Sequence, residues 1–323
     1  MVDATQVSII IPTYNRAAYL SKCLDALAQL NTDPSVYEII IVDNNSTDNT
    51  RQISFDFIKT HPTLCVHYLL ETRQGASNAR NRGVLEAKGP TICFLDDDSP
   101  PSSEWLNNIQ KGFFEPAVGC VGGPSVLDYQ GQERPSWLRG DLQGLISGYS
   151  LPFDTPTALT EWAQFPLSCN MAIRKGIFSE LGLFRVDLDR SGKQVLAAGD
   201  TEMVNRISKA GWKVIYLPDA IVHHIVAPER LAKSHIFRIG SGLAISHIIL
   251  TSDRRPSKIL YWFASDMWYA FRMLIKFIIA FCSRKPLWFD DYMRFWMVFQ
   301  RIPLRIKALF HGYTLEYILS PKI

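Results

Sequence analysis

Three consecutive acids follow an apolar run and have the chemistry to hold a cation. Residues 91–95 have the pattern of a buried parallel strand, and Asp96, Asp97 and Asp98 come directly after it. Adjacent carboxylates repel one another unless solvent or a cation neutralises them. In an extended chain Asp96 and Asp98 point the same way, so one would bind a hard divalent cation and the other a ligand hydroxyl. An acidic turn or helix cap before Pro100 is the alternative interpretation.

Alternating strands and helices must position these acids. The expected elements, in chain order, are a strand at 7–12 closed by a proline, a helix at 17–30, strands at 38–42 and 65–70, a helix at 75–88 and the strand at 91–95. This alternation favours a doubly wound, mainly parallel α/β sheet. Open sheets of this kind bind ligands at the carboxyl ends of their strands, where Asp43 also lies.

Composition and charge narrow the class of protein. The 323 residues are 47% hydrophobic and 20% charged, which is typical of a globular chain. The net charge of +3 is too small to argue for nucleic acid as a partner. The charge is uneven, because residues 250–323 carry 12 Lys and Arg against 5 Asp and Glu, a net +7, and the rest of the chain is at −4. A mildly acidic body is therefore followed by a basic tail.

The C-terminal sequence favours a membrane surface. Charges interrupt the apolar residues 259–263 and 273–282, so no stretch of about 18 uncharged apolar residues is present to span a bilayer. Aromatic residues beside Arg294, Arg301 and Arg305 suit an interfacial helix on an anionic membrane. The alternative is a helical bundle packed on the preceding domain or on a second subunit.

The cysteines and the N-terminus indicate the compartment. Six cysteines without a CxxC pair predict reduced core thiols, and no signal-peptide pattern precedes the first strand. We therefore expect a cytoplasmic protein, peripheral on the inner face of the cell membrane.

Several segments together resemble the ordered motifs of family 2 glycosyltransferases. They are residues 9–16 (IIIPTYNR), 41–48 (IVDNNSTD), 75–83 (GASNARNRG), 94–98 (FLDDD), 170–174 (NMAIR), 199–202 (GDTE) and 218–224 (PDAIVHH). The resemblance implies a GT-A fold, which is a Rossmann-like, mixed but mainly parallel sheet flanked by helices, here with a C-terminal helical extension. Residues 1–227 would form the catalytic domain and 228–323 the helical, basic and aromatic region. The nucleotide-sugar half would cover about 1–125 and the acceptor half about 126–227.

The resemblance also implies a donor site. Pro12, Tyr14 and Arg16 would line the pocket of the nucleotide base, and Asp43 would accept a hydrogen bond from the base. Arg80 would face the diphosphate. From the residues alone, Asp43 also suits a turn with the Asn and Ser that follow it, and Arg80 suits a solvated position on a polar helix.

A divalent cation completes the implied site. By resemblance, Asp98 would ligate Mg²⁺ or Mn²⁺ on the diphosphate, and Asp96 would contact the ribose or metal-bound waters. The cation would stabilise charge on the leaving group. His224 would contact the metal or diphosphate, with His223 as the alternative and a core-edge histidine as the structural interpretation. Asp97 would hydrogen-bond to backbone or adjust the local field.

Asp200 is the candidate general base. It would remove the proton of an acceptor hydroxyl that attacks the anomeric carbon, and the family implies inversion there. The family usually has an acid where this chain has Gly199, so Glu202 is the fallback. A helix cap is the structural alternative for Asp200.

The expected partners are a UDP-sugar donor and a saccharide or lipid-linked acceptor, in the assembly of cell-surface polysaccharide or another glycoconjugate. The aromatic segment 122–166 would cover the donor as a lid or form a surface excursion. The signature Gln-x-x-Arg-Trp of processive synthases does not occur, which favours transfer of one sugar.

Two other functions fit the same residues. A metal-dependent phosphotransferase or phosphatase would use Asp96 as the nucleophile of an Asp96-x-Asp98 pair, and a nucleotide-sugar-binding protein would lack catalysis. Labelled nucleotide sugars separate the three, since the outcomes are transfer, phosphate release alone or binding alone.

Overall fold

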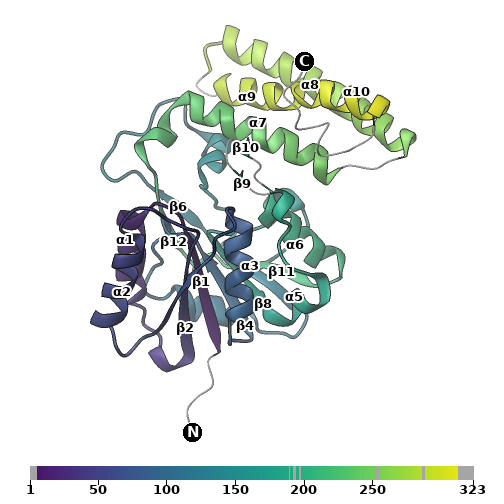
Figure 1. Cartoon of the computed structure of the whole chain (residues 1–323). Coiled ribbons are helices and arrows are strands. Elements are labelled where there is room, and N and C mark those ends of the chain that lie inside the picture. Colours follow the sequence, from purple (N-terminus) through teal and green to yellow (C-terminus); the bar gives the residue numbers. More distant parts are fainter. Residues whose placement is uncertain are drawn as a thin grey trace. The chain divides into compact units, whose positions relative to one another are not determined.

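The computed structural model describes residues 6–188, 190–191, 194–195, 198–251, 255–285 and 288–311 (Figure 1). The chain divides into two compact units. Unit 1 comprises Met1–Gln130, Ser147–Asp189 and Gly199–Val226, and unit 2 comprises Gly131–Ile146, Arg190–Ala198 and Ala227–Ile323.

Unit 1 is built on an eight-stranded sheet of order β3-β2-β1-β4-β8-β5-β11-β7. Its strands are β1 Val7–Thr13, β2 Tyr37–Asp43, β3 Cys65–Leu70, β4 Thr91–Leu95, β5 Val118–Gly122, β7 Thr157–Leu159, β8 Asn170–Arg174 and β11 Lys213–Tyr216. β8 runs antiparallel to β4 and β5, and β7 antiparallel to β11, while the other pairs are parallel. Beside this sheet, β6 Ser125–Asp128 pairs in parallel with β12 Val222–Ile225. The predicted mixed, mainly parallel α/β fold class is confirmed.

Helices cover both faces of the large sheet (Figure 1). They are α1 Ala17–Leu27, α2 Thr50–Thr60, α3 Ala76–Glu86, α4 Trp105–Gly112, α5 Lys175–Leu181 and α6 Gly199–Lys209, with short 3-10 turns η1 Pro34–Val36, η3 Trp162–Gln164 and η4 Val186–Leu188. Alternate residues of β2 enter opposite cores, Ile39 and Ile41 with α1, α2 and α4, and Ile40 and Val42 with α3, α5 and α6. The run of apolar residues in the sequence therefore reflects a strand buried on both faces.

The structure corrects two local predictions. β1 continues one residue past Pro12, which lies opposite Val42 in the parallel register with β2. The acids after β4 are not extended, because the Ser99 amide donates to the Asp96 carbonyl oxygen at 3.0 Å and closes a turn. The prediction that Asp96 and Asp98 point the same way by strand alternation was therefore wrong.

Unit 2 is mainly helical. It contains α7 Lys233–Leu250, α8 Pro256–Cys282, α9 Trp288–Phe299 and α10 Arg301–His311, the 3-10 turns η2 Gly140–Ile146 and η5 Pro228–Leu231, and the short antiparallel pair β9 Arg190–Ser191 and β10 Gln194–Val195. Residues 252–254, 286–287 and 312–323 of the predicted basic tail lie outside the described residues. Within the described part of the chain, no helix has both the length and the apolarity to cross a bilayer.

Ion pairs stabilise unit 2, and those of Asp266 are buried between α8 and α10. Asp266 of α8 accepts from Arg305 at 3.1 Å and lies 3.4 Å from Arg301, both of α10. Arg294 of α9 contacts Asp141 and Asp290. The predicted position on a lipid-binding surface was wrong for Arg301 and Arg305, because both contact the buried Asp266. Arg294 stays one-third exposed, so its predicted role is not contradicted.

Candidate active site

The polar edge of unit 1 lies at the carboxyl ends of β1, β2 and β4. The register of β1 on β2 places Thr13 opposite Asp43, where both strands end, and β4 ends on the other side of β1 at Leu95. Each strand is followed by a loop of polar residues. Parallel strands thus bring segments that are distant in sequence to one edge of the sheet.

The loops after β1 and β2 are hydrogen-bonded into one layer. Asn15 has a left-handed φ of 52°, which asparagine tolerates, and its amide donates to Ser46 Oγ at 2.9 Å. The Asn15 side chain accepts from the Thr47 amide at 2.7 Å. This layer presents the exposed ring of Tyr14 and leads into Arg16.

Asp43 is buried and held from two sides. Its Oδ1 accepts from the Ser46 amide at 2.8 Å, so the predicted turn is present. Its Oδ2 accepts from the Tyr68 hydroxyl at 2.8 Å. Burial, followed by this hydrogen bond to the carboxylate, raises the pKa of Tyr68 to about 12. Tyr68 was not predicted from the sequence, because its contact with Asp43 depends on the parallel register of β2 and β3.

Arg16 spans two of the three acids. Its Nη1 lies 2.5 Å from Asp98 Oδ2 and 3.1 Å from Asp97 Oδ1, and Thr13 Oγ1 donates to Asp97 Oδ2 at 2.8 Å. Both carboxylates are buried. Burial, and then the neighbouring charge of Asp98, raise the pKa of Asp97 to about 7. The expectation that Asp97 bonds to backbone was wrong, because its oxygens bond to two side chains.

A second guanidinium group holds the third acid. Arg80 Nη2 lies 3.1 Å from Asp96 Oδ1. Arg80 belongs to α3, and its side chain is 11% exposed, so the solvated arginine considered from the sequence is not what the structure shows. The acid triplet is thus neutralised in part by cations from the α1 and α3 regions.

The structure separates the two adjacent histidines. His224 is 1% exposed, with Nδ1 3.3 Å from Asp98 Oδ1 and 2.9 Å from Ser99 Oγ, whereas His223 is exposed. Both belong to β12, in which successive side chains point to opposite faces. Since the Ile225 amide donates to the Asp98 carbonyl oxygen at 2.8 Å, β12 runs alongside the acidic turn and brings His224 to it.

Asp200 lies in the first turn of α6 and is oriented by backbone. Its Oδ2 accepts from the Ser168 amide at 3.1 Å and its Oδ1 from the Thr201 amide at 2.8 Å. The fallback residue Glu202 bonds instead to Arg206 at 3.0 Å along the same helix. These contacts leave Asp200 as the better placed of the two acids.

Cys169 connects Asp200 to the acid triplet. Burial raises the pKa of its thiol, and the charges of Asp96, Asp98 and Asp200 each raise it further. The chain itself links these acids, because the amide of the preceding residue, Ser168, donates to Asp200, and the following residue, Asn170, pairs with Leu95 just before Asp96. Gly199 stands where the resemblance implies an acid, and a Cβ added there would lie 3.3 Å from Ser77 Oγ.

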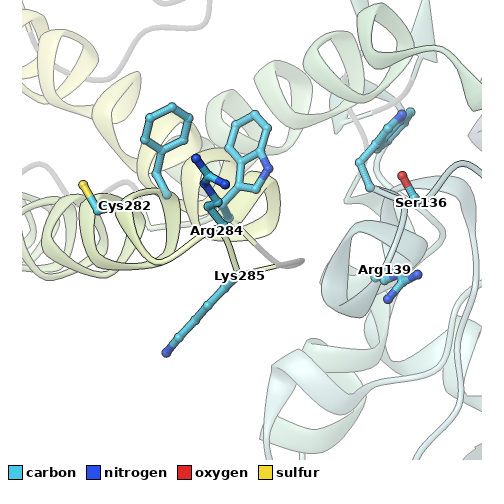
Figure 2. Close-up of a pocket in the computed structure, with 8 residues that line it drawn as sticks. Ser136, Arg139, Cys282, Arg284 and Lys285 are labelled. Atoms are coloured by element: carbon cyan, nitrogen blue, oxygen red, sulfur yellow. The ribbon is translucent and has the colours of Figure 1, made fainter.

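A separate cavity lies within unit 2 (Figure 2). Its volume is about 670 Å³, and its walls combine aromatic rings with cations, namely Trp137, Phe281, Trp288, Arg139, Arg284 and Lys285, together with Ser136 and Cys282. Figure 2 shows Arg139 on a different segment from Arg284 and Lys285, which follow α8.

The fold and the acidic sheet edge define an α/β enzyme class, and comparison with known proteins identifies the family. A model of glycosyl transferase family 2 matches residues 8–182, more than half of the chain. The chain therefore belongs to glycosyl transferase family 2, as the sequence motifs predicted. Membership argues against the phosphotransferase alternative, which rested on Asp96 and Asp98 alone.

Two relatives and one solved structure extend this finding. Glycosyltransferase AglE of Haloferax volcanii is 27% identical over 243 residues, which cover 73% of this chain and 72% of the relative. Succinoglycan biosynthesis protein ExoM of Rhizobium meliloti is 27% identical over 242 residues, 71% and 69% of the two chains. The mannosyltransferase PcManGT from Pyrobaculum calidifontis, solved with GDP-Man and Mn²⁺, aligns at a TM-score of 0.59 and 20% identity over 97% of this chain and 77% of its own. This structural likeness shows that the fold is GT-A.

Proposed function

We propose that this protein is a metal-dependent, inverting glycosyltransferase that moves one sugar from a nucleotide-sugar donor to an acceptor hydroxyl. The observation that carries the proposal is the acid triplet at the sheet edge. Asp97 and Asp98 are buried and bonded to Arg16, Asp96 is half-buried and paired with Arg80, and His224 lies beside Asp98. A buried cluster of this charge suits a site that binds a cation and a diphosphate together.

The donor set fits a hard divalent cation. Asp98 offers carboxylate oxygens and His224 offers Nδ1 within 3.3 Å of one of them, and both residues are buried. Arg16 Nη1 lies 2.5 Å from Asp98 Oδ2, so a positively charged group already binds this carboxylate. When bound, Mg²⁺ or Mn²⁺ would stabilise the charge that develops on the nucleoside-diphosphate leaving group. The Mn²⁺ in the PcManGT complex supports this assignment.

The donor nucleotide would lie on the joined loops after β1 and β2. Pro12, Tyr14 and Arg16 line that layer, and Asp43 stands at its edge. Each carboxylate oxygen of Asp43 keeps a second lone pair beyond the bonds from Ser46 and Tyr68, so it can accept an N–H of the base.

The remaining residues of the triplet would orient the donor. Asp96 would contact the ribose or metal-bound waters while Arg80 directs positive charge to the diphosphate. Asp97, bonded to Thr13 and Arg16, would hold the guanidinium group in place.

Asp200 would act as the general base. The Ser168 and Thr201 amides hold its two oxygens, so a lone pair stays oriented to take the proton of the acceptor hydroxyl as that oxygen attacks the anomeric carbon. One displacement from the face opposite the leaving group inverts the anomeric configuration. The donor nucleotide is UDP, as the resemblance implies, or GDP, which is present in the PcManGT complex.

The acceptor is a saccharide or a lipid-linked saccharide in polysaccharide or glycoconjugate assembly. The name of the relative ExoM, a succinoglycan biosynthesis protein, supports a role of this kind. The absence of Gln-x-x-Arg-Trp from the sequence supports transfer of a single sugar.

A donor screen tests the proposal. Thermal shifts with UDP-, GDP- and dTDP-sugars in Mn²⁺ and in EDTA would identify the donor, and the same labelled sugars with oligosaccharide acceptors would show transfer. We expect metal-dependent transfer with release of the nucleoside diphosphate. Release of inorganic phosphate alone would contradict the proposal, and binding without transfer to any acceptor would favour a non-catalytic protein.

We also propose that unit 2 binds an anionic membrane surface at the inner face of the cell membrane. Large apolar side chains of α8 are exposed, namely Leu260, Tyr261, Met267, Trp268, Tyr269, Phe271, Ile275, Ile278, Ile279 and Phe281. Exposed cations accompany them, namely Lys258, Arg272, Lys276, Arg284 and Lys285. A helix with this combination lies in the membrane interface, and each basic residue near an anionic surface contributes about 1 kcal/mol.

Vesicle co-sedimentation tests the membrane proposal. Binding should rise with the fraction of anionic lipid and fall with ionic strength, because salt screens the attraction. If the exposed face of α8 is an oligomer contact instead, the protein will ignore vesicles, and light scattering will report a dimer or larger species.

A further inference from the structure

A second group of potential metal ligands lies at the opposite end of β2 from Asp43. Glu38 is the second residue of β2, and Cys65 begins β3. The parallel register places Glu38 directly beside Cys65, and His67 follows two residues later on the same face of β3. The three side chains therefore meet at the amino ends of the two strands, and each offers one ligand atom, all within 4.8 Å of one another.

Glu38 is a fully buried carboxylate in an apolar strand. Its Oε1 accepts from Ser8 Oγ and from the Lys88 amide, each at 2.6 Å. Its Oε2 lies 3.2 Å from His67 Nε2 and yet accepts no hydrogen bond within the described part of the chain. A buried charge needs a compensating partner. One oxygen is thus fixed by two donors, while the other is directed at the histidine nitrogen without the geometry of a donor–acceptor pair.

Two of the three separations between ligand atoms match a tetrahedral cation, and the third is within 4.8 Å. His67 Nε2 lies 3.2 Å from Glu38 Oε2 and 3.4 Å from Cys65 Sγ. Zinc–ligand bonds of about 2.0–2.2 Å to oxygen and nitrogen and about 2.3 Å to sulfur, at tetrahedral angles, separate O from N by about 3.3 Å and S from N by about 3.6 Å. The two observed distances lie close to these values.

We propose that Glu38, Cys65 and His67 bind a zinc-type divalent cation with a fourth position open. A carboxylate, a thiolate and a neutral imidazole neutralise a 2+ charge, and the Cys65 thiol releases its proton to solvent on binding. Without a cation, burial and then the charge of Glu38 raise the pKa of that thiol. Ser8 and the Lys88 amide act as the outer shell that orients Glu38.

The site is accessible and separate from the glycosyl-transfer site. Cys65 is exposed, the His67 side chain is 40% exposed, and His67 also lines a cavity of about 320 Å³ with Tyr68, Glu86 and Lys88. β3 is an edge strand of the large sheet, so a cation shared with β2 would fasten that edge. The proposal does not depend on the function proposed for Asp98 or Asp200.

Thiol alkylation tests the site in the wild-type protein. Cys65 and Cys282 are both exposed, so Cys282 is the internal control. With free Zn²⁺ at ten times its Kd, the unligated fraction of Cys65 falls about elevenfold, and its alkylation rate falls with it. The Cys282 rate should stay unchanged, and EDTA should restore Cys65. Equal rates at Cys65 with and without Zn²⁺ would overturn the proposal, leaving a hydrogen-bonded Cys–His–Glu group.

Cobalt spectroscopy gives a second, independent readout. Co²⁺ bound to a thiolate shows a near-ultraviolet charge-transfer band, which we expect in the wild type and in Cys282→Ser but not in Cys65→Ser. His67→Ala should abolish tight binding, and Ser8→Ala should weaken affinity by about 10-fold as an outer-shell change. A band of full intensity in Cys65→Ser would contradict the assignment. Because the alkylation test uses the wild-type protein, its result does not depend on whether a variant folds.

Discussion

Replacing Arg16 with methionine tests whether the acid triplet depends on a cation. The change keeps much of the apolar stem and removes the guanidinium group that contacts Asp97 and Asp98. Arg80 stays on Asp96, but two buried carboxylates lose their charged donor. We expect the variant to be less stable in EDTA and to regain stability in Mn²⁺.

The structure sets the size of this effect. Removing one partner of a buried ion pair lowers the free energy of unfolding by about 3–5 kcal/mol. Because the Arg16 side chain is 28% exposed, we expect a loss at the lower end of this range, about 3 kcal/mol. For a unit of this size each kcal/mol lowers Tm by about 2–4 °C, so the melting temperature in EDTA should fall by about 6–12 °C.

Thermal unfolding followed by circular dichroism measures this shift. The matched control is Arg82→Met, because Arg82 forms an exposed i,i+4 pair with Glu86 on α3. Exposed pairs of this kind contribute about 0.3–0.5 kcal/mol, so the control should change Tm by less than about 2 °C. Saturating Mn²⁺ should recover most of the loss in Arg16→Met.

Two results would refute this reasoning. If the melting temperature of Arg16→Met falls no further than that of the surface control Arg82→Met, the triplet does not depend on the guanidinium charge. A large loss that Mn²⁺ and Mg²⁺ leave unchanged would show that the acids do not bind a divalent cation, and the metal assignment of Asp98 would be withdrawn.

Three further substitutions probe the proposed roles. Asp200→Asn keeps the size of the side chain and should lower transfer by about 10²–10⁴-fold with donor binding, followed by thermal shift, unchanged; near wild-type transfer would exclude it as the base. His224→Ala should weaken Mn²⁺-dependent nucleotide binding in calorimetry, whereas His223→Ala, at an exposed position, should not; equal effects would remove His224 from the metal site. Trp268→Glu on α8 should reduce co-sedimentation with anionic vesicles, while Phe114→Glu, at an equally exposed position of unit 1, should not; unchanged binding by Trp268→Glu would contradict the membrane proposal.

The sequence by itself determined the fold class and the sheet edge that carries the candidate site. Runs of apolar residues that alternate with amphipathic segments predict a parallel α/β sheet, because strands buried on both faces must be apolar throughout. Acids at the carboxyl ends of strands, such as Asp43 and Asp96, must lie at the carboxyl edge of that sheet. These inferences need only the local pattern and the direction of each strand.

Only the tertiary structure decided which groups meet. Arg16 reaches Asp98 across 82 residues, and β12 brings His224 rather than His223 to the same carboxylate. Both results depend on strand order and register, which set distances between residues remote in sequence.

The same reason explains the charges that sequence reasoning misplaced. In the sequence, Arg80 sits on a polar segment and Arg305 lies in a basic, aromatic tail, yet both are buried against carboxylates. Glu38 is the one charged residue at the start of the predicted apolar strand 38–42, and β3 places Cys65 and His67 beside it. Burial of a charge depends on the partner that packing supplies, and a single segment of sequence does not contain that partner.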